Sequence, residues 1–163
     1  MLTQVGVDFL VDVRSVPRSR TNPQFNADTL PASLAAAGIA YRHLSALGGL
    51  RHHRKDAPLS ANTLWRNTSF RNYADYAETD AFRDGLRELR GLARQHRCAI
   101  MCAEAVWWRC HRRIIADCLL AEGVPVAHIM GLGRVDLAKL TPGASPRADG
   151  TLVYPSVVGG SDG

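Results

Sequence analysis

The sequence predicts an α/β fold in which a mainly parallel sheet is flanked by helices on both faces, as a three-layer α/β/α sandwich. Short runs of apolar and β-branched residues, typical of buried strands, alternate with segments whose apolar residues recur at helical spacing. Glycines follow several of the helical segments, as they commonly do at helix ends. This alternation indicates βαβ units, in which a helix connects two parallel strands.

The first predicted strand is the apolar run at residues 8–13. Segment 14–25 is rich in Pro, Ser and Arg, and its prolines exclude a continuing central strand because proline cannot donate to the ladder. A helix follows to about residue 37, and residues 39–44 form the second strand. We expect Asn26 or Asp28 to cap the start of this helix and Gly38 to follow its end.

A long polar connection, residues 45–69, follows the second strand. Connections of this length within a compact domain are usually functional or disordered. A short helix is then predicted at residues 70–76. Thr79 caps a longer helix, in which Phe82 and later leucines form an apolar face opposite a charged one.

The second half of the chain continues the alternation and then changes in composition. After residue 131 the sequence is rich in Gly and Pro, with a possible edge strand near its end. The elements expected are a third strand at 98–102, a loop at 103–109, a helix at 110–121 stopped by Gly123, a fourth strand at 124–130, and an edge strand at 151–154 within the extension 131–163.

Length and composition suit a single α/β domain over residues 1–163. The chain has 163 residues, of which 46% are apolar, enough for one hydrophobic core. No apolar run approaches the ~20 residues needed to cross a bilayer. The N-terminus lacks the basic and apolar segments of a signal peptide. We therefore expect a cytoplasmic protein without a membrane role, whose four cysteines are thiols.

The charge of the chain is positive and is carried almost entirely by arginine. The net charge is +5 and the isoelectric point about 9.4. Guanidinium groups pair bidentately with phosphate and carboxylate. The expected partner is therefore an anionic small molecule or a nucleic acid, and no cofactor is indicated. The sequence leaves the oligomeric state open.

Two segments combine arginines with other reactive side chains where a ligand site is expected. In open α/β sheets, ligands bind beyond the carboxyl ends of the strands. This rule selects residues 14–25, after the first strand, and 102–113, after the third. The predicted catalytic residues are Cys102, Glu104, Cys110 and His111, and the predicted anion-binding residues are Arg14, Ser19, Arg20, Arg109 and Arg112.

Either Cys102 or Cys110 could be a nucleophile. Cys102 ends a strand, and Cys110 lies near the start of a helix, where free N–H groups and neighbouring arginines lower a thiol pKa. We place Cys102 first in this role. Glu104 and His111 could transfer protons, or Glu104 could instead hold an arginine. The two cysteines could also form a redox pair, and the whole segment could be a buried structural turn.

Two other classes of function stay open. Cys102, Cys110 and His111 are zinc-ligand types, although the gap between the cysteines is too long for a zinc knuckle. Another histidine could complete such a site only through the fold. A nucleic-acid-binding module, possibly in DNA maintenance, is the other alternative. The residues concerned are His43, His52, His53 and His128 for a metal, and the basic cluster 51–55 with Trp65, Trp107 and Trp108 for a nucleic acid.

Six blocks of sequence together resemble the bacterial and archaeal family called domain of unknown function 488. The blocks are DVRSVPRSR at 12–20, NPQFN at 22–26, LGG at 47–49, FRNYADY at 70–76, CAE at 102–104 and CHR at 110–112. The resemblance runs from about Val5 to Tyr154 and implies a small α/β sandwich, but no established activity. It also implies a strand carrying Gly-His-Ser before the segment that matches Val5, whereas the sequence given begins within the helix that follows that strand.

Overall fold

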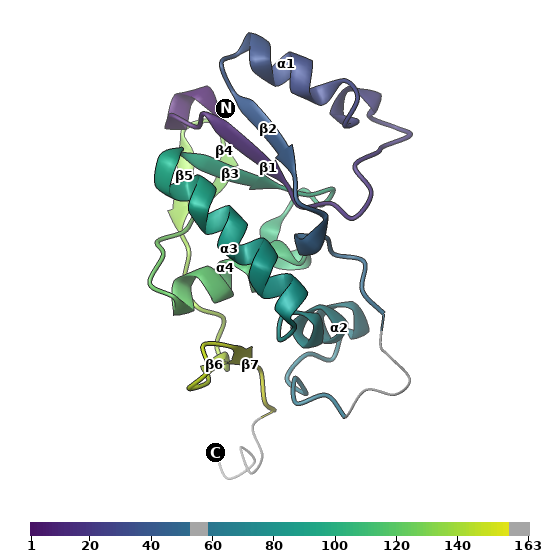
Figure 1. The fold of residues 1–163 in the computed structure, drawn as a ribbon, viewed down its shortest axis with the longest axis vertical. Coiled ribbons are helices and arrows are strands. Elements are labelled where there is room, and N and C mark those ends of the chain that lie inside the picture. The colour runs from purple at the N-terminus through teal and green to yellow at the C-terminus, as the bar shows by residue number, and fades with distance from the viewer. Residues whose placement is uncertain (53–58, 157–163) are drawn as a thin grey trace.

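The computed structural model describes residues 1–52 and 59–156. It confirms a mixed α/β fold built on a three-stranded parallel sheet with the order β2-β1-β3 (Figure 1). The strands are β1 (Phe9–Asp12), β2 (Ala40–His43) and β3 (Cys98–Met101). Because the last residues of all three strands are paired in register, their carboxyl ends meet at one edge of the sheet.

Alternate residues of the central strand β1 pack into two separate hydrophobic clusters. Leu10 packs on one face with residues of α1 (Leu30–Ala36). Val11 points to the other face, where α3 (Asp80–Gln95) and α4 (Arg112–Ala121) supply the buried leucines and isoleucines. Alternation of side chains across the strand therefore lets one short sheet bury both of its faces.

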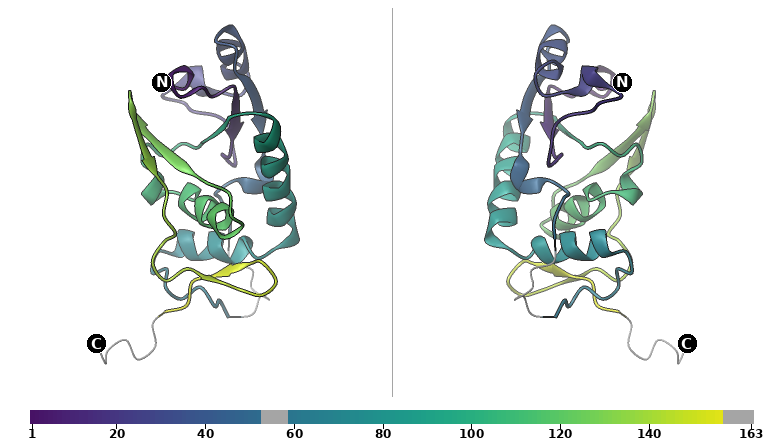
Figure 2. Two further views of the ribbon diagram at one scale, coloured as in Figure 1. Left: turned by 90° about the vertical axis from the view of Figure 1, so that its left-hand side faces the viewer. Right: turned by 90° about the vertical axis from the view of Figure 1, so that its right-hand side faces the viewer.

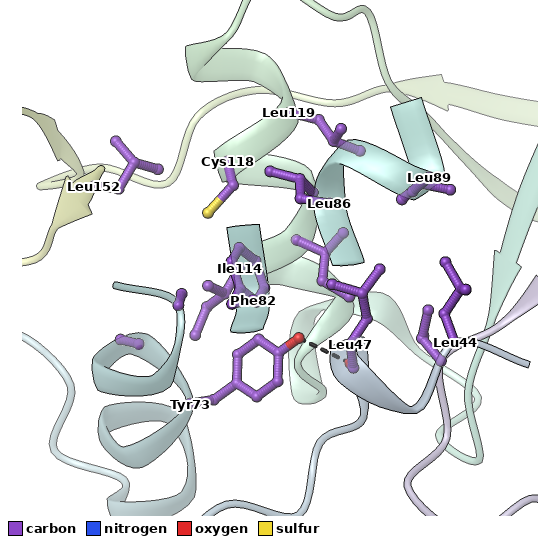
Figure 3. Close-up of a cluster of buried hydrophobic side chains, with 14 of the residues drawn as sticks. Leu44, Leu47, Tyr73, Phe82, Leu86, Leu89, Ile114, Cys118, Leu119 and Leu152 are labelled. Carbon is purple, nitrogen blue, oxygen red and sulfur yellow. Dashed lines mark hydrogen bonds between the residues drawn. The ribbon is translucent and has the colours of Figure 1, made fainter. Parts of the chain in front are cut away.

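The larger core joins α3 and α4 to α2 (Thr68–Tyr76) and to the single turn η3 (Ser45–Leu47) (Figure 3). Tyr73 is buried, and its hydroxyl donates a hydrogen bond to the carbonyl oxygen of Leu47 at 2.8 Å. Phe82 packs edge-on against Tyr73 with ring centroids 6.0 Å apart. Gly85 lets α3 approach η3 closely, because a Cβ there would lie 2.9 Å from the Cβ of Ala46.

Side-chain caps define the starts of two helices. The carboxamide oxygen of Asn67 accepts from two backbone N–H groups of α2, and Thr79 caps α3 as the sequence predicts. The predicted caps of α1 are wrong, because Asn26 accepts instead from the backbone N–H of Ser19 at 2.6 Å and α1 begins after Thr29. Gly38 follows α1 in the left-handed conformation, with φ 75°.

The fourth strand differs from the sequence prediction in its partner. β4 (Ala127–Gly131) pairs antiparallel with β5 (Arg134–Leu137), whereas a mainly parallel sheet was expected to include it. Gly133, with φ 69°, supports the tight reversal that joins the two strands. Figure 2 shows this hairpin standing to one side of the parallel sheet.

The predicted edge strand at 151–154 also forms a separate hairpin. β7 (Leu152–Val153) pairs antiparallel with β6 (Ser145–Pro146) instead of extending the parallel sheet. Tyr154 follows β7 into the core, and its hydroxyl donates to the buried carboxylate of Asp117 on α4 at 2.8 Å. Residues 145–154 are thus attached to the core. The remaining single-turn helices are η1 (Thr3–Val5), η2 (Pro23–Phe25) and η4 (Trp107–Arg109).

Within residues 1–52 and 59–156, no helix combines the length and the apolar character that crossing a bilayer requires.

The core leads to a prediction about stability. Replacing Phe82 with Ala should lower the free energy of unfolding by about 3–5 kcal/mol, because it leaves a cavity among α2, α3 and η3. Leu132→Ala is the matched control, since this leucine is 75% exposed and its truncation should change the stability by less than ~0.5 kcal/mol. Denaturant unfolding followed by circular dichroism measures both. Equal effects of the two substitutions would contradict the assigned core.

Candidate functional site

Two thiols lie in contact at the carboxyl end of the parallel sheet. Cys102 follows β3 directly and Cys110 lies just before α4. The Cys102 thiol donates a hydrogen bond to the Cys110 sulfur, with 3.1 Å between the two sulfur atoms. This separation is about 1 Å longer than a disulfide bond, and both cysteines are free. The chain reversal between β3 and α4 therefore places a donor thiol and an acceptor sulfur together.

Arg112 completes the surroundings of the Cys110 sulfur. Its guanidinium Nε donates to Cys110 Sγ at 3.0 Å, and its backbone N–H donates at 3.3 Å. The other end of the guanidinium donates to the backbone oxygen of Glu104 at 2.6 Å, which fixes the side chain across the loop. The backbone N–H of Glu104 in turn donates to Cys102 Sγ at 3.3 Å. Cys110 thus accepts hydrogen bonds from a thiol, a guanidinium and the first N–H of a helix.

These contacts separate the acidities of the two thiols. The hydrogen bond from Cys102, together with the charge and hydrogen bonds of Arg112, lowers the pKa of Cys110 to about 6 against the opposing effect of burial. The pKa of Cys102 is raised, because this thiol is the hydrogen-bond donor to Cys110 and is itself partly buried. When the pair ionises, the negative charge therefore resides mainly on Cys110, and Cys102 keeps its proton.

His111 is held as a neutral ring beside the thiols. Its Nε2 lies 2.7 Å from the carbonyl oxygen of Val13, so Nε2 carries the hydrogen and Nδ1 keeps a lone pair. Burial, with the nearby charges of Arg112 and Arg51, lowers the pKa of His111 to about 4. Gly49 packs against the ring, and any side chain there would collide with it, because a Cβ would lie 2.5 Å from Nδ1.

A buried ion pair forms the opposite wall of the site. The carboxylate of Asp12, at the end of β1, accepts from Arg14 Nε at 2.9 Å and Nη2 at 2.6 Å. The hydroxyl of Tyr41 on β2 donates to the same carboxylate at 2.5 Å. Arg14 Nη2 also donates to the carbonyl oxygen of Phe25 at 2.6 Å. Burial alone would raise the pKa of Asp12, but the hydrogen bonds from Arg14 and Tyr41 outweigh it, and the pKa is lowered.

A pocket of about 480 Å³ lies between the thiol pair and the buried ion pair. This is within the usual size range of small-molecule sites. Its lining brings together side chains from all the segments that follow the three strands. The predicted site residues that line it are Arg14, Cys102, Glu104, Arg109, Cys110 and His111, and the further lining residues include Ser15, Gly49, Asn67, Ser69 and Tyr73.

Three of the predicted site residues are not part of the lining of this pocket. Ser19 and Arg20 do not belong to the lining of this pocket; Ser19 Oγ accepts from the backbone N–H of Asn22 at 3.0 Å. Arg112 contacts the Cys110 sulfur, so this arginine is committed to the thiolate. The role of Ser19 and Arg20 in binding an anion stays a prediction.

The residues singled out for nucleic-acid binding do not gather at the pocket. Trp65 is buried, and Trp107 stacks on His128 with 3.9 Å between ring centroids, whereas Trp108 is exposed. Arg51 lies over the ring of Tyr76, 3.7 Å from its centroid. The rest of the basic cluster 51–55 falls largely outside the described residues. Nucleic-acid binding stays a prediction.

Cys102, Cys110 and His111 are the residues that could hold a metal ion. Their ligand atoms all lie within 4.8 Å of one another. A structural zinc site needs a fourth ligand. Of the histidines considered for that role, His43 bonds to the backbone oxygen of Arg14 and His128 stacks on Trp107. His52 is exposed and His53 lies outside the described residues. The arrangement therefore fits a pair of thiols better than a closed metal site.

Several residues of the site carried no signal in the sequence. Nothing in the sequence distinguishes Tyr41 from other strand residues, but its hydroxyl donates to Asp12. Nothing in the sequence distinguishes Tyr73 from a core aromatic, although Tyr73 also lines the pocket. Gly49 belongs to a Gly-Gly pair that marked only a loop. That pair was the one available clue, because consecutive glycines in a long connection often allow close backbone approach.

Together these features define a mixed α/β protein with an arginine-supported pair of thiols at the carboxyl ends of parallel strands. The family model described as "Domain of unknown function DUF488" matches residues 1–119, and the chain belongs to this family. The match includes both thiols and ends within α4, short of the resemblance that the sequence suggested as far as Tyr154. We find no match to the chain among curated proteins or among solved structures.

The buried ion pair predicts a strong effect of Asp12→Asn on stability. The substitution leaves Arg14 with an unpaired buried charge, so the free energy of unfolding at pH 7 should fall by about 3–5 kcal/mol. Because the folded-state pKa of Asp12 is lowered, the pair stabilises the fold above the unfolded pKa of ~3.9 and loses this effect as the pH falls through the folded pKa. The difference in free energy of unfolding between wild type and Asp12→Asn, called the deficit below, should therefore become smaller at acid pH.

Asp84→Asn is the control for this prediction, since Asp84 pairs with Arg87 at the surface and both are well exposed. Its effect should stay within ~1 kcal/mol. Denaturant unfolding at several pH values measures both variants. A deficit of Asp12→Asn that is small, or that grows in acid, would show that the pair does not carry this stability.

The acidity of Cys110 gives a second prediction. Its alkylation by iodoacetamide should follow a pH midpoint near 6, well below the ~8.5 of an ordinary thiol. Arg112→Gln should raise this midpoint by about 1 unit or more, because the thiolate loses its guanidinium donor. Arg113→Gln removes the same charge from the neighbouring position, which contacts Thr141, and should shift the midpoint less. Mass spectrometry of each cysteine gives the rates, and equal shifts would refute a specific role of Arg112.

Proposed function

We propose that this protein is a cytoplasmic cysteine-dependent enzyme that acts on an anionic substrate, within a three-layer α/β/α frame. The observation that carries the proposal is the Cys110 sulfur with its three donors, of which Arg112 Nε lies at 3.0 Å. A sulfur that accepts a thiol, a guanidinium and a helix N–H is stabilised as a thiolate. Thiolates, not thiols, are the nucleophilic form of cysteine.

Cys110 is the better candidate for the nucleophile than Cys102, to which the sequence gave priority. Cys102 keeps its proton, because it donates to Cys110 and accepts only from the backbone of Glu104. Cys110 lies against α4, whose N-terminal dipole and free N–H groups favour negative charge. Both cysteines belong to the lining of the pocket, which places a bound substrate beside Cys110.

The pocket favours an anion because arginines line it from two sides. Arg109 is exposed at its rim and Arg14 lies in its wall. The carboxylate of Asp12 neutralises part of the charge of Arg14, so Arg109 is the main candidate to meet a carboxylate or phosphate. Asn67 and Ser69, from the start of α2, add neutral polar groups to the lining.

His111 contributes to the proposed site mainly by its position. The ring, just before α4, bonds to the oxygen of Val13, just after β1, and this contact fixes the start of α4 beside the sheet. Its low pKa keeps it neutral, so it does not compete with the arginines for the charge of the substrate. The exposed carboxylate of Glu104 at the pocket rim is the remaining candidate for proton transfer.

The proposal predicts that an anion bound in the pocket protects Cys110 from alkylation. Inorganic phosphate should slow alkylation of Cys110 at pH 7, relative to sodium chloride at equal ionic strength, because it occupies the arginine side of the pocket. Arg109→Gln should weaken this protection several-fold. Arg87→Gln, on the exposed face of α3, is the matched control and should not. Per-cysteine mass spectrometry measures the rates. Absence of protection, or equal protection in Arg109→Gln and wild type, would overturn the anion site.

A further inference from the structure

A second thiol lies in contact with the Cys110 sulfur, to which Arg112 Nε also donates. Cys102 Sγ lies 3.1 Å from Cys110 Sγ, closer than two unbonded sulfur atoms normally pack. The nitrogen of His111 nearest to the sheet is occupied by the oxygen of Val13, and the carboxylate of Glu104 is exposed. The thiol of Cys102 is therefore the nucleophilic group placed to react with a sulfur that is bound covalently to Cys110.

The sulfur atoms of Cys102 and Cys110 can also approach each other with little rearrangement of the backbone. Cys102 and Cys110 are separated by a loop of seven residues, and this loop is largely exposed apart from Val106 and Trp107, which are half-buried. Closing a disulfide shortens the sulfur–sulfur distance by about 1 Å. That approach leaves the ends of β3 and α4 nearly in place, because it needs mainly a rotation of one side chain.

From this geometry we propose that the protein is a dithiol reductase of anionic disulfides, with Cys110 as the attacking thiol and Cys102 as the resolving thiol. The inference rests on the function proposed above and names its reaction class. Arg109 at the pocket rim would pair with a carboxylate of the substrate. The pocket of about 480 Å³ admits a small-molecule disulfide and opens onto both sulfurs.

The reaction balances in two exchange steps. The Cys110 thiolate attacks one sulfur of the substrate, R–S–S–R, so that a Cys110–S–R bond forms and one R–S⁻ leaves with the electron pair. Once Cys110 is bound in the mixed disulfide, Cys102 no longer faces a thiolate, so it releases its proton to solvent and its thiolate attacks Cys110 Sγ; the second R–S⁻ leaves with the electron pair and takes up a proton from solvent. The substrate has gained two electrons as two thiols, and the protein has lost two as the Cys102–Cys110 disulfide. A separate dithiol reductant must restore the enzyme by the same exchange.

The test uses the anionic disulfide dithiobis(nitrobenzoate), which releases coloured thionitrobenzoate, on the full reduced chain with a chelator present. At pH 6, Cys110 should react about tenfold faster than an ordinary thiol, because its larger thiolate fraction outweighs its lower nucleophilicity. Wild type should release a second equivalent rapidly as the internal disulfide closes. Cys102→Ser should stop after one equivalent with the reagent attached to Cys110, and Cys110→Ser should lose the fast phase. Cys98→Ser is the matched control and should behave as wild type.

The outcomes separate the two proposals. If wild type keeps the reagent on Cys110, or if Cys102→Ser releases the second equivalent as fast as wild type, the dithiol reaction is wrong while the reactive thiolate remains. If Cys110 reacts no faster than Cys98, both proposals fail. Intact mass and near-ultraviolet circular dichroism of each variant distinguish these results from misfolding.

A neutral disulfide, dithiodipyridine, tests the preference for an anion. Arg109→Gln should slow the reaction with dithiobis(nitrobenzoate) several-fold and leave the rate with dithiodipyridine unchanged. Equal slowing of both reagents would mean that Arg109 acts on the thiolate itself, and unchanged rates with both would remove Arg109 from substrate recognition. Either result would overturn the assignment of an anionic substrate.

Discussion

Asp12 is fully buried at the carboxyl end of the central strand, and the surroundings of the site follow from the need to satisfy its charge. Arg14 supplies the opposite charge from the same strand end, and Tyr41 adds a hydroxyl from β2. Arg14 in turn holds the carbonyl oxygen of Phe25, so the proline-rich loop is drawn back over the sheet. One carboxylate thereby fixes two strands and the loop that forms a wall of the pocket.

The next residue along, Val13, connects this wall to the thiols. Its backbone N–H donates to the oxygen of Met101 on β3, and its own oxygen accepts from His111 before α4. The segment between Met101 and His111 contains both cysteines. The positions of Cys102 and Cys110 are therefore set from each end by hydrogen bonds to the same residue, Val13, which directly follows β1. This shared anchor explains how two thiols on different elements come into contact.

The sequence was sufficient to predict a strand or a helix wherever a local pattern of residues determines it. β1 and β3 follow from short apolar runs, β2 lies within the predicted strand 39–44, and α3 follows from the Thr79 cap and the apolar spacing that begins at Phe82. The partner of β4 could not be predicted, because strand pairing depends on which edges the folded chain brings together. The sulfur–sulfur distance and the role of Tyr41 likewise arise from tertiary contacts between segments that are far apart in the sequence. Asn26 failed as a cap for the same reason, since a distant backbone N–H competes for its side chain.

The buried carboxylate of Asp117 connects the part of the chain that the family model matches to the segment that follows it. The family match ends at residue 119, two positions beyond Asp117. The partners of this carboxylate are the backbone N–H of Thr141 and the hydroxyl of Tyr154, both contributed by the segment after the match. α4, which begins two residues after Cys110, is thus held from behind by sequence beyond the family match. Residues 141 and 154 therefore help to position the helix beside the two thiols, although they lie outside the matched part of the chain.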